Sequence, residues 1–306
     1  MPLNKELRGA AMSRRSVSSL LLAAAVMASQ CAHAAQPPAP PPTAQQAALA
    51  DLTGYWVAVV AQDWRYRMIT PAKGDYRGVP LNAAGRKVAD AFDPAPYGGA
   101  NYQTSAIIDC RAYGAAALLH MPTRLHITWA GPNQLKIESD WGEQTRLVNF
   151  MPNKPFADGQ LPLLVQAQAA GPDPAPSIQG RSVAFWEQPY RFTASVFDRG
   201  PNNRPGGLGA AAAAAQMQGG SLAVVTTALS PGWLRRNGVP YSSQARVVEH
   251  FQTFDDPMGA KWFNVAIQVI DPEYLTTPFM VTGDFMKESD GSRWAPHSCK
   301  QGGGNQ

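Results

Sequence analysis

The sequence has few cysteines and, beyond its first 35 residues, no long apolar segment. Its three cysteines include no closely spaced pair, and the His-Glu-x-x-His pattern of zinc enzymes is absent, so we expect no metal site. Phosphate-binding loops, dinucleotide-binding glycine patterns and the Gly-x-Ser-x-Gly elbow are also absent, and we expect no cofactor. No segment after residue 35 approaches the roughly 20 apolar residues that a transmembrane helix requires.

Residues 1–35 have the layout of a secretory signal peptide. A basic start precedes an apolar run over residues 20–28 and a small-x-small ending, which places cleavage after Ala34 or Ala35. A lipoprotein interpretation would instead modify Cys31. The sequence therefore predicts an exported protein, either periplasmic or secreted.

The chain carries little excess charge once this segment is removed. Residues 1–35 contain four of the 26 basic residues and one of the 22 acidic residues, so 22 basic residues remain against 21 acidic ones. No basic run remains in the mature chain. A nucleic acid is therefore not an expected partner.

Two cysteines, Cys110 and Cys299, remain after the signal peptide. In an oxidising compartment the simplest arrangement is one disulfide, which would tie the C-terminal end to the body of the protein. Two free thiols are the alternative, but nothing around either residue suggests a catalytic cysteine.

The mature chain has mostly β patterning. Residues 36–50 are proline-rich and predict a disordered spacer, and residues 300–306 predict a disordered tail. Residues 80–92 predict one helix with Asn82 as its N-cap. Apolar residues alternate with polar ones between turn signals, which predicts strands over 52–69, 124–129, 134–140, 143–150, 181–187, 221–229, 244–254, 261–270 and 279–287.

We expect residues 51–299 to form a single, mainly β domain. Antiparallel strands that close into a barrel lose their exposed edges, so the predicted fold is an antiparallel, barrel-like domain with one short helix and long loops. The segments 166–177 and 199–220 are rich in Pro, Ala and Gly and are interpreted as loops.

The segment 62–68, QDWRYRM, is the first candidate binding site. As part of a strand it would carry Asp63, Arg65 and Arg67 on one face, with aromatic residues that begin at Trp64 on the other. The charged face either lines a cavity and binds a carboxylate or phosphate, or is ordinary solvent-exposed surface.

The segment RLHITW places Arg124 and His126 on one strand face and Trp129 on the other. Arg124 and His126 form a candidate acid/base or anion-binding pair, or else belong to the surface. Arg146, on a following strand, is a further candidate, although cross-strand ion pairs would explain it without a function.

Glu249 shares a strand face with Val247 and Phe251. Burial among apolar neighbours raises the pKa of a carboxyl group, which suits a general acid or base. The alternative is an ion pair between Glu249 and a nearby arginine.

Residues 230–242, SPGWLRRNGVPYS, predict an irregular excursion that contains Trp233 and Tyr241. Such an ordered loop is either a lid over a barrel mouth or a packing plug.

Several segments together resemble an uncharacterised family of exported bacterial proteins. They include GYW, DWRYRM, PTRLHITW and NGVPYS, and the resemblance covers residues 52–299. The resemblance implies export and common ancestry, and it does not indicate which reaction, if any, the protein catalyses. The GYW at the start of the first strand is also similar to the Gly-x-Trp of lipocalin-like barrels, which carry hydrophobic ligands.

The leading functional hypothesis is a barrel whose cavity binds a small hydrophobic or aromatic molecule with a polar or anionic end. The polar end would be anchored by Arg65, Arg67, Arg124 and His126, and the walls would be formed by Trp64, Trp129 and Trp233. One alternative is a cofactor-free lyase, hydratase or isomerase with His126 or Glu249 as its acid/base group. Another is an envelope protein that docks a partner through its proline-rich spacer and the alanine-rich segment.

Overall fold

A computed structural model describes residues 40–151, 173–187 and 220–300. The predicted signal peptide with Cys31, most of the two predicted low-complexity loops and the predicted tail from residue 301 lie outside the described residues.

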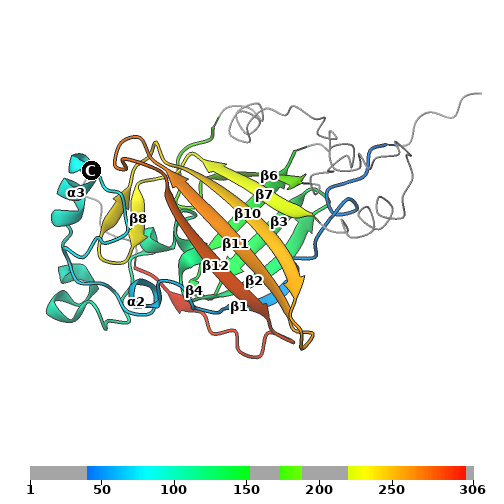
Figure 1. Cartoon of the computed structure of the whole chain (residues 1–306), viewed down its shortest axis with the longest axis horizontal. Coiled ribbons are helices and arrows are strands. Elements are labelled where there is room, and N and C mark those ends of the chain that lie inside the picture. Colours follow the sequence, from blue (N-terminus) through cyan, green and yellow to red (C-terminus); the bar gives the residue numbers. More distant parts are fainter. Residues whose placement is uncertain (1–39, 152–172, 188–219, 301–306) are drawn as a thin grey trace, which may run out of the picture. The chain divides into compact units, whose positions relative to one another are not determined.

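Nine strands form a closed barrel (Figure 1), which confirms the predicted fold class. They are β1 (Gly54–Ala58), β2 (Arg124–Gly131), β3 (Gln134–Ser139), β5 (Thr145–Phe150), β6 (Arg181–Glu187), β7 (Ser221–Thr227), β10 (Arg246–Asp255), β11 (Lys261–Ile270) and β12 (Phe279–Lys287). Their order around the barrel is β1–β12–β11–β10–β7–β6–β5–β3–β2, and β1 closes the ring by pairing with both β2 and β12. All neighbouring pairs are antiparallel except β5 and β6, which run parallel.

Burial alternates along the strands because successive side chains point to opposite faces. On β5, Arg146, Val148 and Phe150 are buried, and the residues between them are exposed. Leu135 and Ile137 of β3 are buried in the same alternating way. One face of each strand therefore supplies the interior of the barrel.

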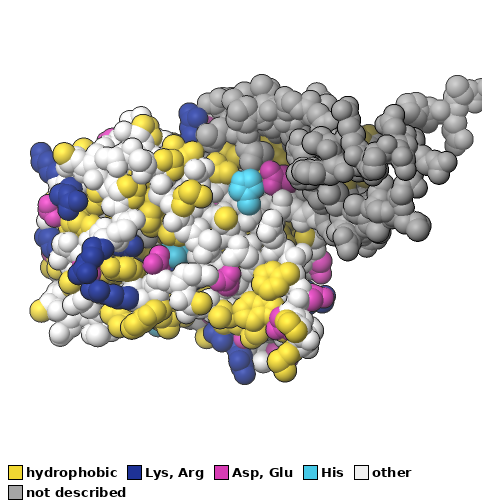
Figure 2. All heavy atoms as spheres, viewed as in Figure 1, with side chains coloured by type: hydrophobic (Ala, Val, Ile, Leu, Met, Phe, Trp, Pro, Cys, Tyr) yellow, Lys and Arg dark blue, Asp and Glu magenta, His cyan; other side chains and the backbone are white. Residues whose placement is uncertain are grey.

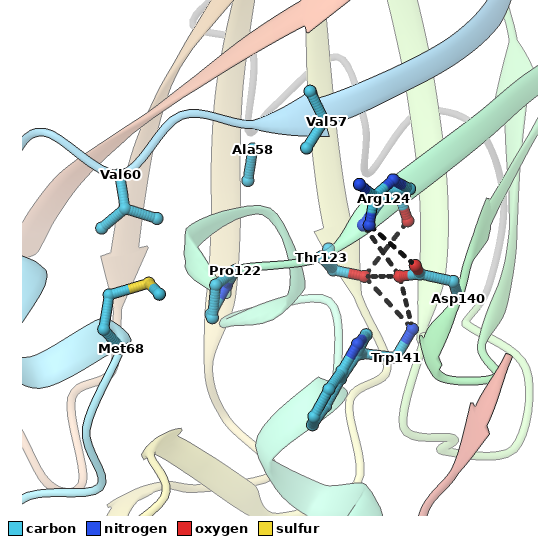
Figure 3. A pocket seen from close by; sticks show the side chains of 9 residues that line it. All are labelled: Val57, Ala58, Val60, Met68, Pro122, Thr123, Arg124, Asp140 and Trp141. Carbon is cyan, nitrogen blue, oxygen red and sulfur yellow. Dashed lines mark hydrogen bonds and ion pairs between the residues drawn. The ribbon is translucent and has the colours of Figure 1, made fainter. Parts of the chain in front are cut away.

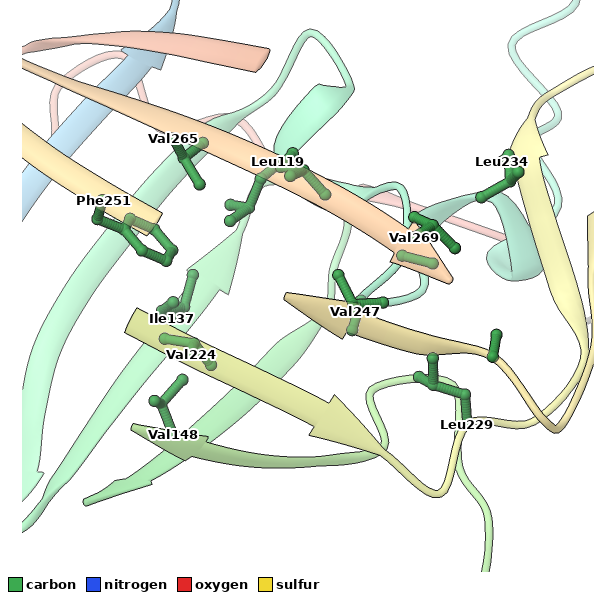
Figure 4. Close-up of a cluster of buried hydrophobic side chains, with 14 of the residues drawn as sticks. Leu119, Ile137, Val148, Val224, Leu229, Leu234, Val247, Phe251, Val265 and Val269 are labelled. Carbon is green, nitrogen blue, oxygen red and sulfur yellow. The ribbon is translucent and has the colours of Figure 1, made fainter. Parts of the chain in front are cut away.

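Side chains fill the barrel interior. One continuous cluster of buried apolar residues includes Ile137, Val224 and Val265 from three different strands (Figure 4). Aromatic rings pack in the same cluster, and the ring centroids of Phe263 and Phe285 lie 4.7 Å apart. Each large apolar side chain that is fully buried contributes about 1.5–3 kcal/mol to folding. The interior is thus a packed core, and the candidate pockets lie at its surface.

The predicted helix is confirmed. α3 (Ala83–Asp90) begins after Asn82, whose side-chain oxygen accepts a hydrogen bond from the Gly85 N–H at 2.9 Å. Only glycine fits at position 85, because a Cβ there would lie 2.5 Å from the carbonyl oxygen of Tyr274. Within the described ranges, no helix is long and apolar enough to cross a membrane.

The prediction of a strand through residues 62–68 is wrong. Trp64–Arg67 instead form one helical turn, α2. Asp63 adopts a left-handed backbone conformation with φ 51°, which ends the extended chain, and its carbonyl oxygen accepts a hydrogen bond from the Arg67 N–H at 3.2 Å. A helical turn rotates successive side chains by about 100°, so Arg65 is exposed and Arg67 is buried, and they do not share one face.

Residues 230–242 are more regular than the predicted excursion. β8 (Gly232–Arg235) and β9 (Val239–Tyr241) pair antiparallel as a short hairpin. Gly238 has φ 81° and permits the tight turn between these two strands. Most of the hairpin is buried, so it packs as part of the structure.

The second half of the predicted spacer 36–50 packs against the barrel. Ala44 belongs to the buried core cluster, and its carbonyl oxygen accepts a hydrogen bond from Trp186 Nε1 at 2.9 Å. The Ala44 N–H donates to Asn133 Oδ1 at 2.7 Å. The spacer interpretation did not anticipate these contacts, because composition alone does not show which backbone groups a neighbouring barrel binds.

Cys110 and Cys299 form the predicted disulfide. Cys299 follows the short strand β13 (His297–Ser298), which pairs parallel with β4 (Trp141–Gly142). The Cys110 N–H also donates to the carbonyl oxygen of Lys300 at 3.0 Å. The disulfide therefore fixes the C-terminal segment beside β4.

Removal of the disulfide should lower the free energy of unfolding. The two cysteines are 189 residues apart, so their bridge restricts the unfolded chain strongly. A Cys110→Ser/Cys299→Ser double variant should lose about 2–5 kcal/mol in urea denaturation. A reductant should lower the stability of the wild type toward that of the variant and leave the variant unchanged. Equal midpoints for all four samples would contradict this prediction.

Candidate functional site

A pocket of about 350 Å³ opens where β1 ends and β2 begins (Figure 3). This volume lies within the range of small-molecule sites. Three parts of the chain enclose it: the end of β1 with the segment leading to α2, the start of β2, and the bend between β3 and β4. Its lining residues are Val57, Ala58, Val60, Met68, Pro122, Thr123, Arg124, Asp140 and Trp141.

Asp140 lies at the polar side of this pocket and is fully buried. Its Oδ1 accepts three hydrogen bonds, from the Thr123 hydroxyl at 2.8 Å and from the backbone N–H groups of Arg124 at 2.8 Å and Trp141 at 2.7 Å. Its Oδ2 has no hydrogen-bond partner among the described residues. A buried carboxylate oxygen without a donor is costly, so Oδ2 is a position that a ligand donor would stabilise.

Arg124 provides the donors of the same pocket. Its side chain is 27% exposed, and its Nε donates to Glu288 Oε2 at 3.1 Å. Its Nη1 lies 3.9 Å from Asp140 Oδ2, too far for a hydrogen bond. The guanidinium is therefore held in place from one side, beside the unpartnered carboxylate oxygen.

The remaining lining is largely apolar. Met68, at the end of α2, is 55% exposed, and Figure 3 shows it beside Val60, across the pocket from Trp141. The Trp141 ring stacks on His297 with centroids 4.6 Å apart. The His297 segment is the one that the disulfide fixes, so the disulfide also orients this wall of the pocket.

A larger hollow of about 660 Å³ lies along the outer face of β5 and the segment 173–181. The arginine that lines it, Arg181, is already paired with Asp173 at 3.3 Å. This hollow is larger than the first pocket, but its charged side chains, Arg181 and Asp173, already pair with each other.

Of the predicted ligand-binding residues, only Arg124 lines the pocket at β1 and β2. Trp64 is exposed on α2, and Arg65 forms an ion pair with Asp75 at 2.9 Å. Arg67 is buried and donates through Nε to the carbonyl oxygen of His120 at 2.6 Å. Asp63, which precedes α2, is half-exposed.

His126 lies on the outer side of β2. Its ring stacks on Tyr55 with centroids 4.1 Å apart, and its Nδ1 lies 3.3 Å from Glu138 Oε2. Register pairs His126 with both of these residues on the neighbouring strands. These contacts are those of a cross-strand surface cluster.

Arg146 and Glu249 form an ion pair inside the barrel, and both are fully buried. Arg146 Nη1 donates to Glu249 Oε1 at 2.9 Å, and Nη2 bonds Oε2. Arg146 also donates to the hydroxyls of Ser182 at 2.9 Å and Thr226 at 2.8 Å. Four strands, β5, β6, β7 and β10, thus bring their polar groups together, and the ion-pair alternative for Glu249 is the one observed.

Three of the four predicted aromatic candidates pack within the structure. Trp129 lies 5.4 Å from the Phe150 ring, measured between centroids. Trp233 Nε1 donates to Asp109 Oδ2 at 2.8 Å. Tyr241 is buried in the core, and desolvation raises the pKa of its hydroxyl.

Asp140, Trp141 and Met68 are pocket residues that the sequence did not identify as a site. Asp140 continues the alternation of Lys136 and Glu138 in the sequence, a pattern that is typical of a solvent-exposed strand face. The sequence marks the adjacent bend only by Gly142, and in the structure Gly142 and Glu143 both have positive φ. Such a bend at the end of a strand redirects the side chains before it. In the described part of the chain, no group of three or more metal-ligating side chains comes together.

Comparison with known proteins yields no match: no family model, no curated protein and no solved structure is significantly similar to this chain.

Replacement of Glu249 by leucine should destabilise the protein strongly, because Arg146 would remain as a buried, unpaired cation. We expect a loss of about 3–5 kcal/mol in urea denaturation. An Arg146→Met/Glu249→Leu double variant should recover most of that loss. The matched control is Glu138→Leu, whose partly exposed pair with Lys136 on the outer side of the barrel should be worth less than about 1 kcal/mol. Equal losses in Glu249→Leu and Glu138→Leu would refute this account of the ion pair.

Acid should destabilise the protein through His120. Burial, together with the nearby charges of Arg67 and Arg235, lowers the pKa of His120 from 6.5 to about 4. Between these two pH values the unfolded chain binds a proton at His120 and the folded protein does not. The contribution of neutral His120 to the free energy of unfolding is therefore fully present above pH 6.5 and is lost as pH falls toward 4. Between about pH 7 and about pH 4.5, wild type should lose roughly 2–3 kcal/mol more than His120→Gln in urea denaturation. An identical pH dependence of the free energy of unfolding in wild type and His120→Gln would contradict this prediction.

Proposed function

We propose that the pocket at the β1–β2 edge binds a small, mainly apolar molecule whose polar end both accepts and donates hydrogen bonds. The observation that carries this proposal is the unpartnered Asp140 Oδ2 beside the Arg124 guanidinium, in a pocket with otherwise largely apolar walls. Arg124 would donate to the acceptor of the ligand, and Asp140 would accept from its donor.

The charges around the pocket favour a polar end without net charge. Arg124 already faces the carboxylates of Glu288 and Asp140, and Arg293 approaches Glu288 at 4.0 Å. Two cations and two anions therefore balance each other. A carboxamide or a hydroxyl group suits this arrangement better than a carboxylate, which Asp140 would repel.

Binding has more support than acid/base catalysis by the predicted residues. His126 is engaged with Tyr55 and Glu138 on the outer side of β2. Glu249 is engaged with Arg146 inside the packed barrel. Neither residue lines the pocket. The docking alternative depends on the spacer 36–50, whose second half packs against the barrel, and on the alanine-rich segment, which lies almost entirely outside the described residues. It stays a prediction.

Export of the protein is part of the proposal. The Cys110–Cys299 disulfide supports it, because such bridges persist in oxidising compartments. N-terminal sequencing of the protein from fractionated cells should find a new N-terminus near residue 35 in the periplasmic or secreted fraction. Full-length protein found solely in the cytosol would overturn export and leave the pocket unaffected.

Ligand binding should depend on Arg124. Ligand-observed NMR with benzamide, benzoate and benzyl alcohol should detect stronger binding of benzamide and benzyl alcohol than of benzoate. Arg124→Gln should weaken benzamide binding by about 10-fold or more, because a hydrogen bond from a charged donor is lost. The matched control is Lys136→Gln, which removes one cation from the outer side of β3.

Two results would overturn the binding proposal. One is the absence of binding by any of the three probes together with no extra mass in a native mass spectrum of the purified protein. The other is equal benzamide affinity in wild type and Arg124→Gln. A bound mass that is lost on denaturation would instead supply the natural ligand for the same comparison.

A further inference from the structure

A second polar cluster lies where α2 meets the β8–β9 hairpin, apart from the pocket residues. Arg67 comes from α2, Arg235 ends β8, and Arg236 follows in the turn. Arg236 Nη2 donates to the carbonyl oxygen of Arg67 at 3.1 Å, which joins the two elements. Arg67 is 1% exposed and Arg235 is 4% exposed, and both act electrostatically on His120, so two buried guanidinium groups lie near this residue.

No carboxylate of the described residues forms an ion pair with these buried guanidinium groups. Arg67 donates to the carbonyl oxygens of His120 at 2.6 Å and Gln62 at 3.3 Å. Arg235 donates to the carbonyl oxygen of Arg77 at 2.7 Å. Backbone carbonyl groups supply hydrogen-bond acceptors but no net charge, and the Arg235 guanidinium also lies over the Tyr66 ring, 4.0 Å from its centroid. Both cations are compensated by carboxylates beyond ion-pair distance, Asp63 among them.

Two buried donor atoms of the cluster are unused. Arg67 Nη2 and Arg236 Nε have no hydrogen-bond partner in the described part of the chain. Desolvation lowers the pKa of Arg67 and of Arg235, which reflects the cost of burying these cations. A buried donor without an acceptor adds to that cost. Both atoms would be satisfied by an anion with several oxygens.

The carboxylates near the cluster are few and mostly occupied. Asp284 accepts hydrogen bonds from Gln62 at 2.7 Å and Asn264 at 2.6 Å. Asp75 pairs with exposed arginines of its own surface. Asp63 remains, with its side chain 45% exposed and 3.8 Å from His120 Nε2. Figure 2 shows that Lys and Arg side chains also gather over the α2 and α3 end of this face.

Asp63 has a left-handed backbone conformation at the point where the chain enters α2. Its φ of 51° lies in the left-handed region, which non-glycine residues seldom adopt. Strain of this kind concentrates at functional sites. Its carboxylate interacts electrostatically with Arg67, Arg235 and His120, so it lies near all three groups and would repel an anion bound there.

We propose that Arg67, Arg235 and Arg236 form a binding site for an oxyanion group, with Asp63 as the group that a bound anion displaces or repels. A phosphate group suits the site best, because its oxygens can accept hydrogen bonds from several guanidinium donors at once. The site is separate from the pocket beside Arg124 and does not depend on the function proposed for that pocket.

Calorimetry with inorganic phosphate at constant ionic strength tests the site. Saturable binding is expected, with sulfate competing and acetate binding more weakly. Asp63→Asn should tighten phosphate binding about fivefold or more, because one opposing charge is removed and asparagine tolerates the left-handed conformation. Asp255→Asn, at an exposed Asp255–Lys261 pair on the β10–β11 hairpin, removes the same charge elsewhere and should leave the affinity unchanged. Acetate binding as tightly as phosphate would instead identify a carboxylate ligand of the same site.

A second readout separates binding at this site from adsorption elsewhere on the protein. Phosphate beside Arg67 should raise the pKa of His120 above its value of about 4, because a nearby anion favours the protonated ring. NMR titration of the histidine rings measures this shift, and His126 and His250 serve as internal controls. Arg236→Gln should weaken phosphate binding at least tenfold while the variant stays folded by circular dichroism. Absence of saturable binding, equal effects of Asp63→Asn and Asp255→Asn, or an unmoved His120 pKa at saturating phosphate would overturn the proposal.

Discussion

The pairing of β1 with two neighbours at once is the constraint on which the rest of this structure depends. Trp56 lies opposite Leu125 of β2 on one side and Lys287 of β12 on the other. This double pairing closes the barrel, removes its open edges and buries alternate side chains of every strand. Because β1 has only five residues, the chain leaves the barrel after Ala58 and turns into α2. Both the pocket and the arginine cluster contain residues of the segment that follows Ala58.

The buried polar groups inside the barrel and those at its end differ in whether they have partners. Inside the barrel, the Arg146–Glu249 pair is matched in charge, and Arg146 donates further hydrogen bonds to two hydroxyl groups. At the end of the barrel, buried atoms of Asp140 and Arg67 are left without partners. The matched set stabilises a fold by itself, whereas an unmatched buried atom costs stability unless something else binds it. That contrast is the physical basis for locating function at the end of the barrel.

Much of the fold follows from local patterns, because strand alternation and helix capping act over a few residues. Leu135 and Ile137 mark the buried face of β3, and Asn82 marks the start of α3. Local pattern was misleading for the segment 62–68, because its alternating charged and aromatic residues predict a strand. In the structure, the left-handed backbone of Asp63 ends the extended chain, and a helical turn follows. Arg124 was identifiable as a site residue from its type. The role of Asp140 was not identifiable from the sequence. Which of its two carboxylate oxygens finds a hydrogen-bond donor depends on how β2 and β4 lie around it.

The connection between the two ends of the chain has a consequence for biosynthesis. β1 precedes all other barrel strands in the chain, whereas its partner β12 follows all of them, and the disulfide joins cysteines that are 189 residues apart. A growing chain can therefore form the β2–β3 hairpin early, yet it must keep one edge of β1 unpaired until β12 has been made. Such long-range closure slows folding and exposes an edge that other chains can bind. The protein thus has a period during its production when a chaperone that shields β1 would protect it from aggregation.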